Sequence, residues 1–218
     1  MHRYLIKTPW WVKKIFSGYV WSFPDDKPDV YLTFDDGPHP EITTWVLSEL
    51  KKYNAPATFF CIGKNVRAYP EIYKRIIQEG HSIGNHTYNH LNAWKTSAHQ
   101  YEQDIENAAA VIDSNLFRPP YGRILNKNIA GIKQVLGKEA KIVMWDVLSG
   151  DFDKNISQQQ CLQNVLKNTG AGSIIVFHDS LKAFKNLEYA FPLVLENLQQ
   201  RGYTFKKIEM NKSLEVYK

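Results

Sequence analysis

The sequence is poor in cysteine, in long apolar runs and in blocks of like charge. Its 2 cysteines, Cys61 and Cys161, lack any CxxC spacing, so we expect no disulfide framework. No apolar stretch reaches about 18 residues, which excludes a predicted transmembrane helix. No run of like charge is longer than a pair, and this argues against a nucleic-acid-binding protein despite the net charge of +5.

The N-terminal stretch lacks the continuous apolar core of a secretory signal, because Lys7, Pro9, Lys13 and Lys14 interrupt every candidate. We expect residues 1–28 to form an extension that packs on the rest of the domain. The mixture of tryptophan and lysine in this stretch also suits a helix in peripheral contact with a membrane. The expected location is therefore the cytoplasm or the periphery of a membrane.

The chain does contain enough apolar residues, 44% of 218, for one domain with a substantial core, which we place at residues 29–218. Strand-like and helix-like segments alternate along it. The strands are expected at 29–34, 57–63, 81–85, 116–120, 141–147, 172–178 and 203–208. The helices are expected at 41–53, 70–79, 97–113, 126–136, 157–168 and 187–201. This alternation predicts an α/β fold in which about seven parallel strands form an incomplete barrel.

Two adjacent carboxylates, Asp35 and Asp36, follow the first predicted strand in the motif TFDDGPHP. Like charges at the end of a buried strand resist desolvation, so they either lie in a solvated turn or face a cation. Other polar side chains also follow predicted strands, namely His86, His90, Arg118, Asp146, Asp151, His178 and Asp179. In parallel α/β folds the carboxyl ends of the strands share one face, and active sites are built there.

The motif HTYNH places His86 and His90 four residues apart. If this segment makes a helical turn, both imidazoles lie on one side and can bind a single ion. With one carboxylate from TFDDG they would form a three-ligand site that leaves a position for water, and the second carboxylate would serve as a base. The alternative is a pair of unrelated surface histidines.

Five motifs, TFDDG, HTYNH, RPPYG, WDVLSGDF and VFH, occur in the order found in the polysaccharide deacetylases of carbohydrate esterase family four. The chain resembles that family over roughly residues 29–205. The resemblance implies a distorted (β/α) barrel with its active site at the carboxyl ends of the strands. It also implies a hydrolase that removes N-acetyl groups from N-acetylglucosamine-containing poly- or oligosaccharides.

The resemblance also implies the roles of individual residues. The ligands of one divalent ion would be Asp36, His86 and His90, a set that suits zinc but also cobalt, manganese, nickel or iron. In the catalytic set, Asp35 would be the base and Arg118 would orient it. His178 would be the acid, with Asp151 as its partner. The backbone N–H of Tyr121 would be the oxyanion donor.

Three positions depart from the family pattern. Leu148 stands where the family usually has Asp, Phe152 replaces Trp, and Val176 replaces Leu. These changes concern the sugar-facing wall and the pocket for the acetyl methyl group. They leave open a hydrolase of the same family that acts on a small amide, a cyclic imide or an O-acetyl ester. Other open readings are a non-catalytic metal or glycan binder and an iron oxygenase with two histidines and one carboxylate. The oligomeric state is not indicated.

Overall fold

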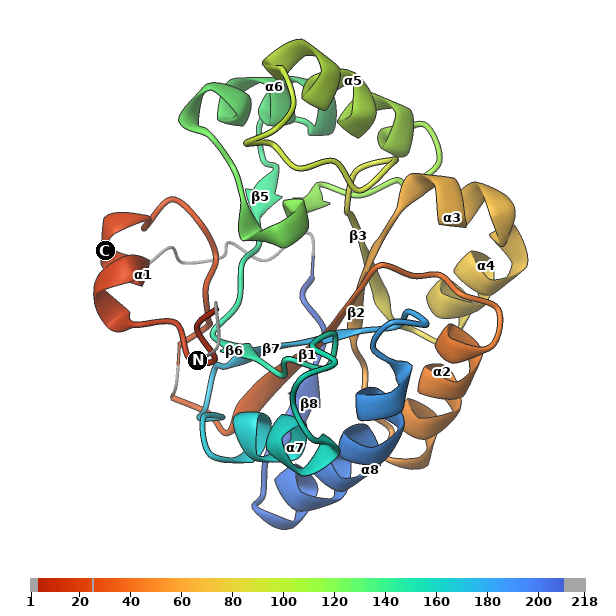
Figure 1. Cartoon of the computed structure of the whole chain (residues 1–218), viewed down its shortest axis with the longest axis vertical. Coiled ribbons are helices and arrows are strands. Elements are labelled where there is room, and N and C mark those ends of the chain that lie inside the picture. The colour runs from red at the N-terminus through yellow and green to blue at the C-terminus, as the bar shows by residue number, and fades with distance from the viewer. Residues whose placement is uncertain (1–3, 25, 210–218) are drawn as a thin grey trace.

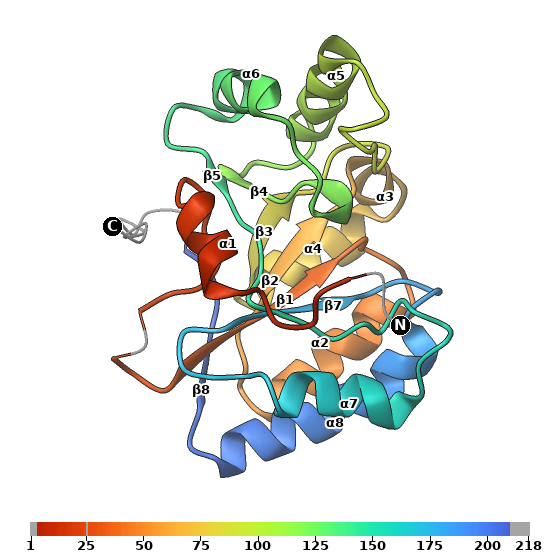
Figure 2. The ribbon, with the colours of Figure 1, turned by 60° about the vertical axis from the view of Figure 1, so that its left-hand side comes forward.

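The computed structural model describes residues 4–24 and 26–209, and a twisted parallel sheet lies at its centre. Its strands are β1 (Asp29–Asp35), β2 (Thr58–Cys61), β3 (Ser82–Asn85), β4 (Leu116–Phe117), β5 (Lys141–Ile142), β6 (Val147–Leu148), β7 (Ile174–His178) and β8 (Thr204–Lys206). They follow the order β5-β4-β3-β2-β1-β7-β6, and β8 pairs with the start of β1. The strands rotate steeply from β3 to β7, so the sheet curls into a half-barrel (Figure 2). The predicted α/β barrel of parallel strands is confirmed.

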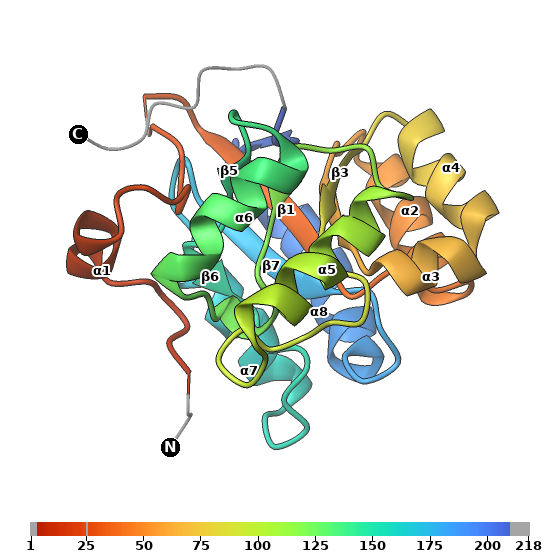
Figure 3. The ribbon, with the colours of Figure 1, turned by 90° about the horizontal axis from the view of Figure 1, so that it is seen from above.

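Helices surround most of this sheet. They are α1 (Trp10–Ile15), α2 (Ile42–Lys52), α3 (Gly63–Ala68), α4 (Pro70–Gln78), α5 (Ala98–Ala109), α6 (Asn126–Leu136), α7 (Gln158–Leu166) and α8 (Phe184–Gln200). The pair α5 and α6 covers one end of the sheet, and α7 and α8 cover the other (Figure 1). Both Figure 1 and Figure 3 place α1 on the opposite side of the sheet from α3 and α4.

Alternation of side chains along β1 separates the core from the barrel interior. Phe34 points toward the outer helices, where its ring stacks on Phe59 of β2 at 5.0 Å and meets Phe191 of α8 edge-on at 5.2 Å. Thr33 and Asp35 point the other way, into the barrel, where both contact Arg118. One face of β1 therefore packs into the main apolar cluster, and the other face carries site residues.

The single strand predicted at 141–147 is wrong. β5 and β6 lie at opposite edges of the sheet, and residues 143–146 cross the gap between them. Arg118 donates from inside the barrel to the carbonyls of Val143 and Met144, at 3.1 and 2.9 Å. Arg118 therefore holds the backbone of the segment that crosses between the two edges of the sheet. The helix α3 was also not predicted, whereas the predicted helices are present with their ends moved by a few residues.

The N-terminal segment lies over this crossing. Isolated bridges join Lys7 to Val147 and Val20 to Val143. The Nζ atoms of Lys7 and Lys13 both contact the buried carboxylate of Asp146, each at 2.5 Å. The part of the predicted extension at residues 1–3 and 25 lies outside the described residues. Within 4–24 and 26–209, no helix combines the length and apolar content needed to cross a bilayer.

Helix α1 has one face on the protein and one face in solvent. Val12 packs against the cluster around Trp21. On the opposite face Trp10 is 73%, Trp11 52% and Ile15 65% exposed. Exposed apolar side chains of this size in one group are typical of a surface that meets another surface.

The aromatic core yields a stability prediction. We expect Phe191→Ala to lower the free energy of unfolding by about 3–5 kcal/mol, because it empties a fully buried ring site between Phe34 and Phe177. Urea unfolding followed by circular dichroism measures this value. The matched control is Leu193→Ala on the same helix, where the side chain is 37% exposed and a loss below about 1 kcal/mol is expected. Equal losses in the two variants would contradict the assignment of the core.

Candidate functional site

The three expected metal ligands meet at the carboxyl ends of β1 and β3, which are separated by β2. Asp36 follows β1, while His86 and His90 follow β3. One ligand atom from each residue lies within 4.8 Å of the other two. The Oδ1 atom of Asp36 is 3.2 Å from Nε2 of His90 and 3.7 Å from Nε2 of His86. The three side chains therefore point at a common centre.

The motif HTYNH does not form a helical turn, which is the condition under which its spacing would place both imidazoles on one side. Residues 86–90 form a loop in which Thr87 and His90 adopt left-handed φ values of 64° and 59°. Residues other than glycine rarely adopt this conformation, and they do so mainly at functional sites. The two imidazoles of His86 and His90 still converge, with ring centroids 5.0 Å apart, because the loop folds back on itself.

A divalent cation fits this arrangement. Oδ1 of Asp36 is buried and accepts no hydrogen bond from residues 4–24 or 26–209. The Nδ1–H of His86 donates to the Arg118 carbonyl at 2.7 Å, which leaves Nε2 of His86 as a lone-pair donor facing Asp36. Burial and the neighbouring His86 lower the pKa of His90 to about 4, so its imidazole is neutral at pH 7. An ionised carboxylate and neutral imidazoles are the donor states that a metal requires.

Asp36 itself has opposing influences on its pKa. Burial raises the pKa of this carboxyl, while His178, His86 and His90 lower it, and the net effect is a pKa below the usual value. Asp36 also has a left-handed φ of 81°, held in place by Asn65, whose side-chain amide donates to the Asp36 carbonyl at 2.8 Å. The fold thus presents an ionised carboxylate from a constrained turn.

Asp35 is paired with a fully buried guanidinium. Arg118 donates from Nη1 to Oδ1 of Asp35 at 2.7 Å and to Oγ1 of Thr33 at 2.7 Å. The Arg118 guanidinium also lies 4.0 Å from the centre of the Phe60 ring. The orientation of Asp35 is therefore set by a charged hydrogen bond within the barrel.

His178 is held by Asp151. The Nδ1–H of His178 donates to Oδ1 of Asp151 at 2.8 Å, and its backbone N–H donates to Oδ2 at 2.7 Å. Burial lowers the pKa of His178, but Asp151, Asp36 and Asp35 outweigh that effect and raise it to about 9. The pairing of β1 with β7 puts His178 directly beside Asp35 in register. A carboxylate and a protonated imidazole therefore flank the candidate metal ligands.

Tyr121 lies in the short 3₁₀ turn Pro120–Gly122 and adopts a left-handed φ of 61°. Its ring is 60% exposed and meets the His90 ring edge-on at 4.6 Å. A Cβ on Gly122 would collide with the ring of Trp145, so glycine is required after Tyr121. The turn carrying the Tyr121 N–H is fixed next to a candidate ligand.

The three departures from the family pattern lie in different surroundings. Leu148 and Val176 are buried, and Leu148 is part of β6. Phe152 is half-buried, and its ring meets the His178 ring edge-on at 5.1 Å. Of the three, Phe152 is therefore the one placed beside a catalytic candidate with part of its surface in solvent.

Sequence reasoning missed residues that support the site. Asp179 is fully buried and accepts the Gly37 N–H at 3.0 Å and the Thr43 hydroxyl. Burial and Asp36 raise the pKa of Asp179 to about 7, against the effect of those hydrogen bonds. A Cβ on Gly37 would collide with the Asp179 carboxylate. The position of Asp179 directly after VFH was the only signal for it in the sequence.

A second missed residue is Asp104, on α5. Its Oδ2 atom accepts the N–H groups of Tyr88 and Asn89 at 3.0 and 2.9 Å, and its Oδ1 accepts the Asn89 side chain at 2.6 Å. These contacts hold the middle of the HTYNH loop. Nothing in the local sequence around Asp104 indicates this role, because its partners are distant along the chain.

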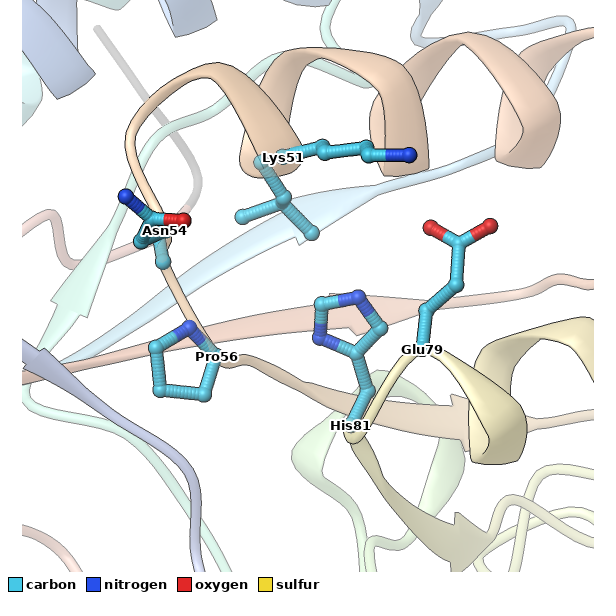
Figure 4. A pocket seen from close by; sticks show the side chains of 7 residues that line it. Lys51, Asn54, Pro56, Glu79 and His81 are labelled. Carbon is cyan, nitrogen blue, oxygen red and sulfur yellow. The ribbon is translucent and has the colours of Figure 1, made fainter.

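A separate cavity of about 320 Å³ lies at the opposite ends of the strands (Figure 4). Its lining includes Pro56, just before β2, and His81, just before β3. His81 accepts the Ala57 N–H at 3.1 Å, and burial lowers the pKa of His81 to about 4. This cavity therefore takes no part in the cluster at the carboxyl ends.

Comparisons with known proteins agree with this geometry. The family model for polysaccharide deacetylase matches residues 23–142. A peptidoglycan-N-acetylglucosamine deacetylase of Bacillus cereus is 41% identical over 180 residues, covering 79% of this chain and 63% of the relative. A second Bacillus cereus protein of that name is 36% identical over 196 residues, covering 87% of this chain and 91% of the relative.

A solved structure is similar over nearly the whole chain. It is the crystal structure of the Bc1960 peptidoglycan N-acetylglucosamine deacetylase in complex with 4-naphthalen-1-yl-N-oxidanyl-benzamide, with a TM-score of 0.83 and 33% identity. The match covers 97% of this chain and 100% of that one. By contrast, this chain spans only 63% of the length of the first Bacillus cereus relative.

The Asp151–His178 pair generates a prediction for stability against pH. The pKa of His178 in the folded protein is about 9, above the usual 6.5, so protonation of His178 stabilises the fold. This stabilisation is fully present below pH 6.5 and is lost as the pH rises through 9. We expect the metal-free protein to lose on the order of 3 kcal/mol from this pair between pH 6 and pH 10. In Asp151→Asn the loss should be much smaller. Urea unfolding across this range measures both curves, and parallel curves would contradict the pairing.

Proposed function

Because the chain belongs to the polysaccharide deacetylase family, we propose that it hydrolyses the N-acetyl amide of N-acetylglucosamine-containing poly- or oligosaccharides. The names of the two Bacillus cereus relatives support this class of substrate. The observation that carries the proposal is the register of β1 and β7, which sets Asp35 beside His178 next to the Asp36, His86 and His90 cluster. A base and an acid beside one candidate cation site are the groups that amide hydrolysis needs.

The proposed metal ligands are Asp36, His86 and His90. When bound there, a divalent ion would polarise the substrate carbonyl and make water a better nucleophile at neutral pH. Two imidazoles with one carboxylate suit zinc, and cobalt, manganese, nickel or iron are compatible with the same donors. The carbonyl of Arg118 supports this role, because it fixes the tautomer of His86.

Asp35 is assigned as the general base. Arg118 occupies its Oδ1 atom at 2.7 Å, and we assign Oδ2 to receive the proton of the attacking water. In this arrangement the base is oriented before the substrate arrives, so no reorganisation is needed at the moment of proton transfer.

His178 is assigned as the general acid. With a pKa raised to about 9 it carries a proton on Nε2 at neutral pH, while its Nδ1–H is engaged by Asp151. It donates that proton to the amide nitrogen as the C–N bond breaks. Water thus supplies the hydroxyl of the acetate product, and the sugar leaves as a free amine.

The Tyr121 N–H is assigned to the carbonyl oxygen on which negative charge develops. The turn at Pro120–Gly122 carries this N–H, and the ring of Tyr121 meets the ring of the proposed ligand His90 at 4.6 Å. Loss of one such donor typically costs about 2.7–4 kcal/mol of transition-state stabilisation.

Phe152 is the observation that favours a second candidate substrate. The Phe152 ring beside His178 is smaller than the tryptophan usual in the family, so it offers less surface for a sugar ring to contact. This suits a small amide, a cyclic imide or an O-acetyl ester. The buried Leu148 and Val176 support no such change, since little of their surface can meet a substrate.

Acetate release tests this function. We expect the purified protein to release acetate from chitin oligosaccharides or peptidoglycan fragments, to stop when a chelator removes the metal, and to recover when zinc or cobalt is added. His178→Asn and Asp35→Asn should lower kcat by roughly 10²–10⁴-fold, since each removes a proton-transfer group. The matched control is His99→Asn, an exposed histidine on α5, which should retain wild-type activity.

Other results would contradict the proposal in distinct ways. Hydrolysis confined to small amides or acetyl esters would move the assignment to the second candidate. Bound metal with no hydrolysis of any amide or ester would leave a metal or glycan binder.

We also propose that α1 makes peripheral contact with an anionic membrane. Its solvent face presents Trp10, Trp11 and Ile15 with Lys14 among them, and tryptophan is the residue most typical of membrane interfaces. Residues 1–24 contain no acidic side chain. Lys14 on this face adds attraction to anionic headgroups of about 1 kcal/mol.

Vesicle sedimentation tests this contact. We expect binding to vesicles of phosphatidylcholine with phosphatidylglycerol, and weaker binding to phosphatidylcholine alone. Trp10→Ala should reduce the binding severalfold, because it removes a ring that is 73% exposed on α1. Trp94→Ala, which removes a 60% exposed ring elsewhere, is the control and should have no effect. Retention on insoluble chitin without any vesicle binding would contradict the membrane contact.

A further inference from the structure

The N-terminal segment is attached to β6 just before a loop of the active site. The Leu148 N–H donates to the Ile6 carbonyl at 2.8 Å, and the Thr8 N–H donates to the Asp146 carbonyl at 2.9 Å. β7 occupies the other edge of β6. β6 runs directly into the loop at residues 149–153, which carries Asp151, the partner of His178. The N-terminal segment therefore flanks the start of this loop.

Tyr4 continues this contact along the loop itself. Its hydroxyl donates to Oδ2 of Asp153 at 2.9 Å. Its ring lies 5.2 Å from the Phe152 ring at a tilt of 53°, and the Phe152 ring lies 5.1 Å from the His178 ring at 73°. Tyr4 is thus joined to the His178 imidazole through one intervening aromatic ring.

The loop has a second support from α8. The Asn186 side chain donates to the carbonyls of Asp151 and Asp153 at 3.0 and 3.2 Å. Gly150 adopts a left-handed φ of 76°, and a Cβ there would lie 3.0 Å from the Tyr4 hydroxyl. The loop backbone is therefore held between α8 and Tyr4, with little room on the Tyr4 side.

We propose that Tyr4 is a positioning residue for the active site, because it holds Phe152 in its edge-on contact with His178. This contact supports the imidazole that Asp151 orients through Nδ1, and it fixes the place of the half-buried ring beside that imidazole. The kinetic consequence rests on the proposed deacetylase function, whereas the geometric part stands without it. A displacement of about 1 Å in a catalytic group costs on the order of 10²-fold in rate.

Variants of Tyr4 separate the ring contact from the hydrogen bond. We expect Tyr4→Ala to lower kcat roughly tenfold and to raise KM, because both the acid and the adjacent wall lose their support. Tyr4→Phe keeps the ring and loses only the bond to Asp153, so kcat should stay within roughly threefold of wild type. The control is Leu5→Ala, the next residue along, whose side chain is 59% exposed and should have no effect.

A readout independent of activity is the chemical shift of the His178 ring protons, because the Phe152 ring shields or deshields them. We expect these signals to move in Tyr4→Ala and to stay in place in Tyr4→Phe and Leu5→Ala. Unmoved His178 signals in Tyr4→Ala, or an equal loss of kcat in Tyr4→Phe and Tyr4→Ala, would overturn the proposal. A wild-type protein that releases no acetate would instead overturn the proposed function, and the shifts would still test the role of Tyr4.

Discussion

The guanidinium of Arg118 lies inside the barrel without exposed surface and connects the parts of the site. It donates to Asp35 on β1 and to two carbonyls of the segment at 143–146, while the Arg118 carbonyl accepts the Nδ1–H of His86. One residue therefore orients the proposed base, a proposed metal ligand and the crossing segment that separates β5 from β6. A buried charge tolerates no loss of a partner, since an uncompensated ion typically costs about 3–5 kcal/mol.

Backbone strain is concentrated at the same end of the barrel. Within the described parts of the chain, 5 residues other than glycine have left-handed φ values, and 4 of them belong to the site, namely Asp36, Thr87, His90 and Tyr121. Each such residue costs on the order of 1–3 kcal/mol, which the surrounding contacts must offset. Asn65 and Asp104 supply such contacts, because they bind the backbone of the two ligand-bearing loops. The ligands are thus held near one another before any ion arrives.

The sequence predicted the sheet, most helices and the residue types of the site, because apolar strands that end in carboxylates or histidines leave a local pattern. It did not predict the geometry of HTYNH, since the folded-back loop depends on Asp104, which is far along the chain from the strand that His86 follows. The split of the expected strand at 141–147 was also hidden, because its two halves pair with strands that are distant from each other in the chain, β4 and β7. The contact of Tyr4 with Phe152 was not predicted either, because the two residues lie far apart in the chain and no local pattern links them.

The central claim is that Asp36, His86 and His90 bind a divalent cation at the carboxyl ends of β1 and β3, next to Asp35 and His178. The most direct measurement is an anomalous-scattering map from crystals grown with zinc and recorded above and below its absorption edge. The account predicts one strong peak within coordination distance of Oδ1 of Asp36 and both Nε2 atoms, about 2.0–2.2 Å from each. No peak at this place in crystals that bind zinc elsewhere, or ligand atoms too far apart to share one ion, would contradict it.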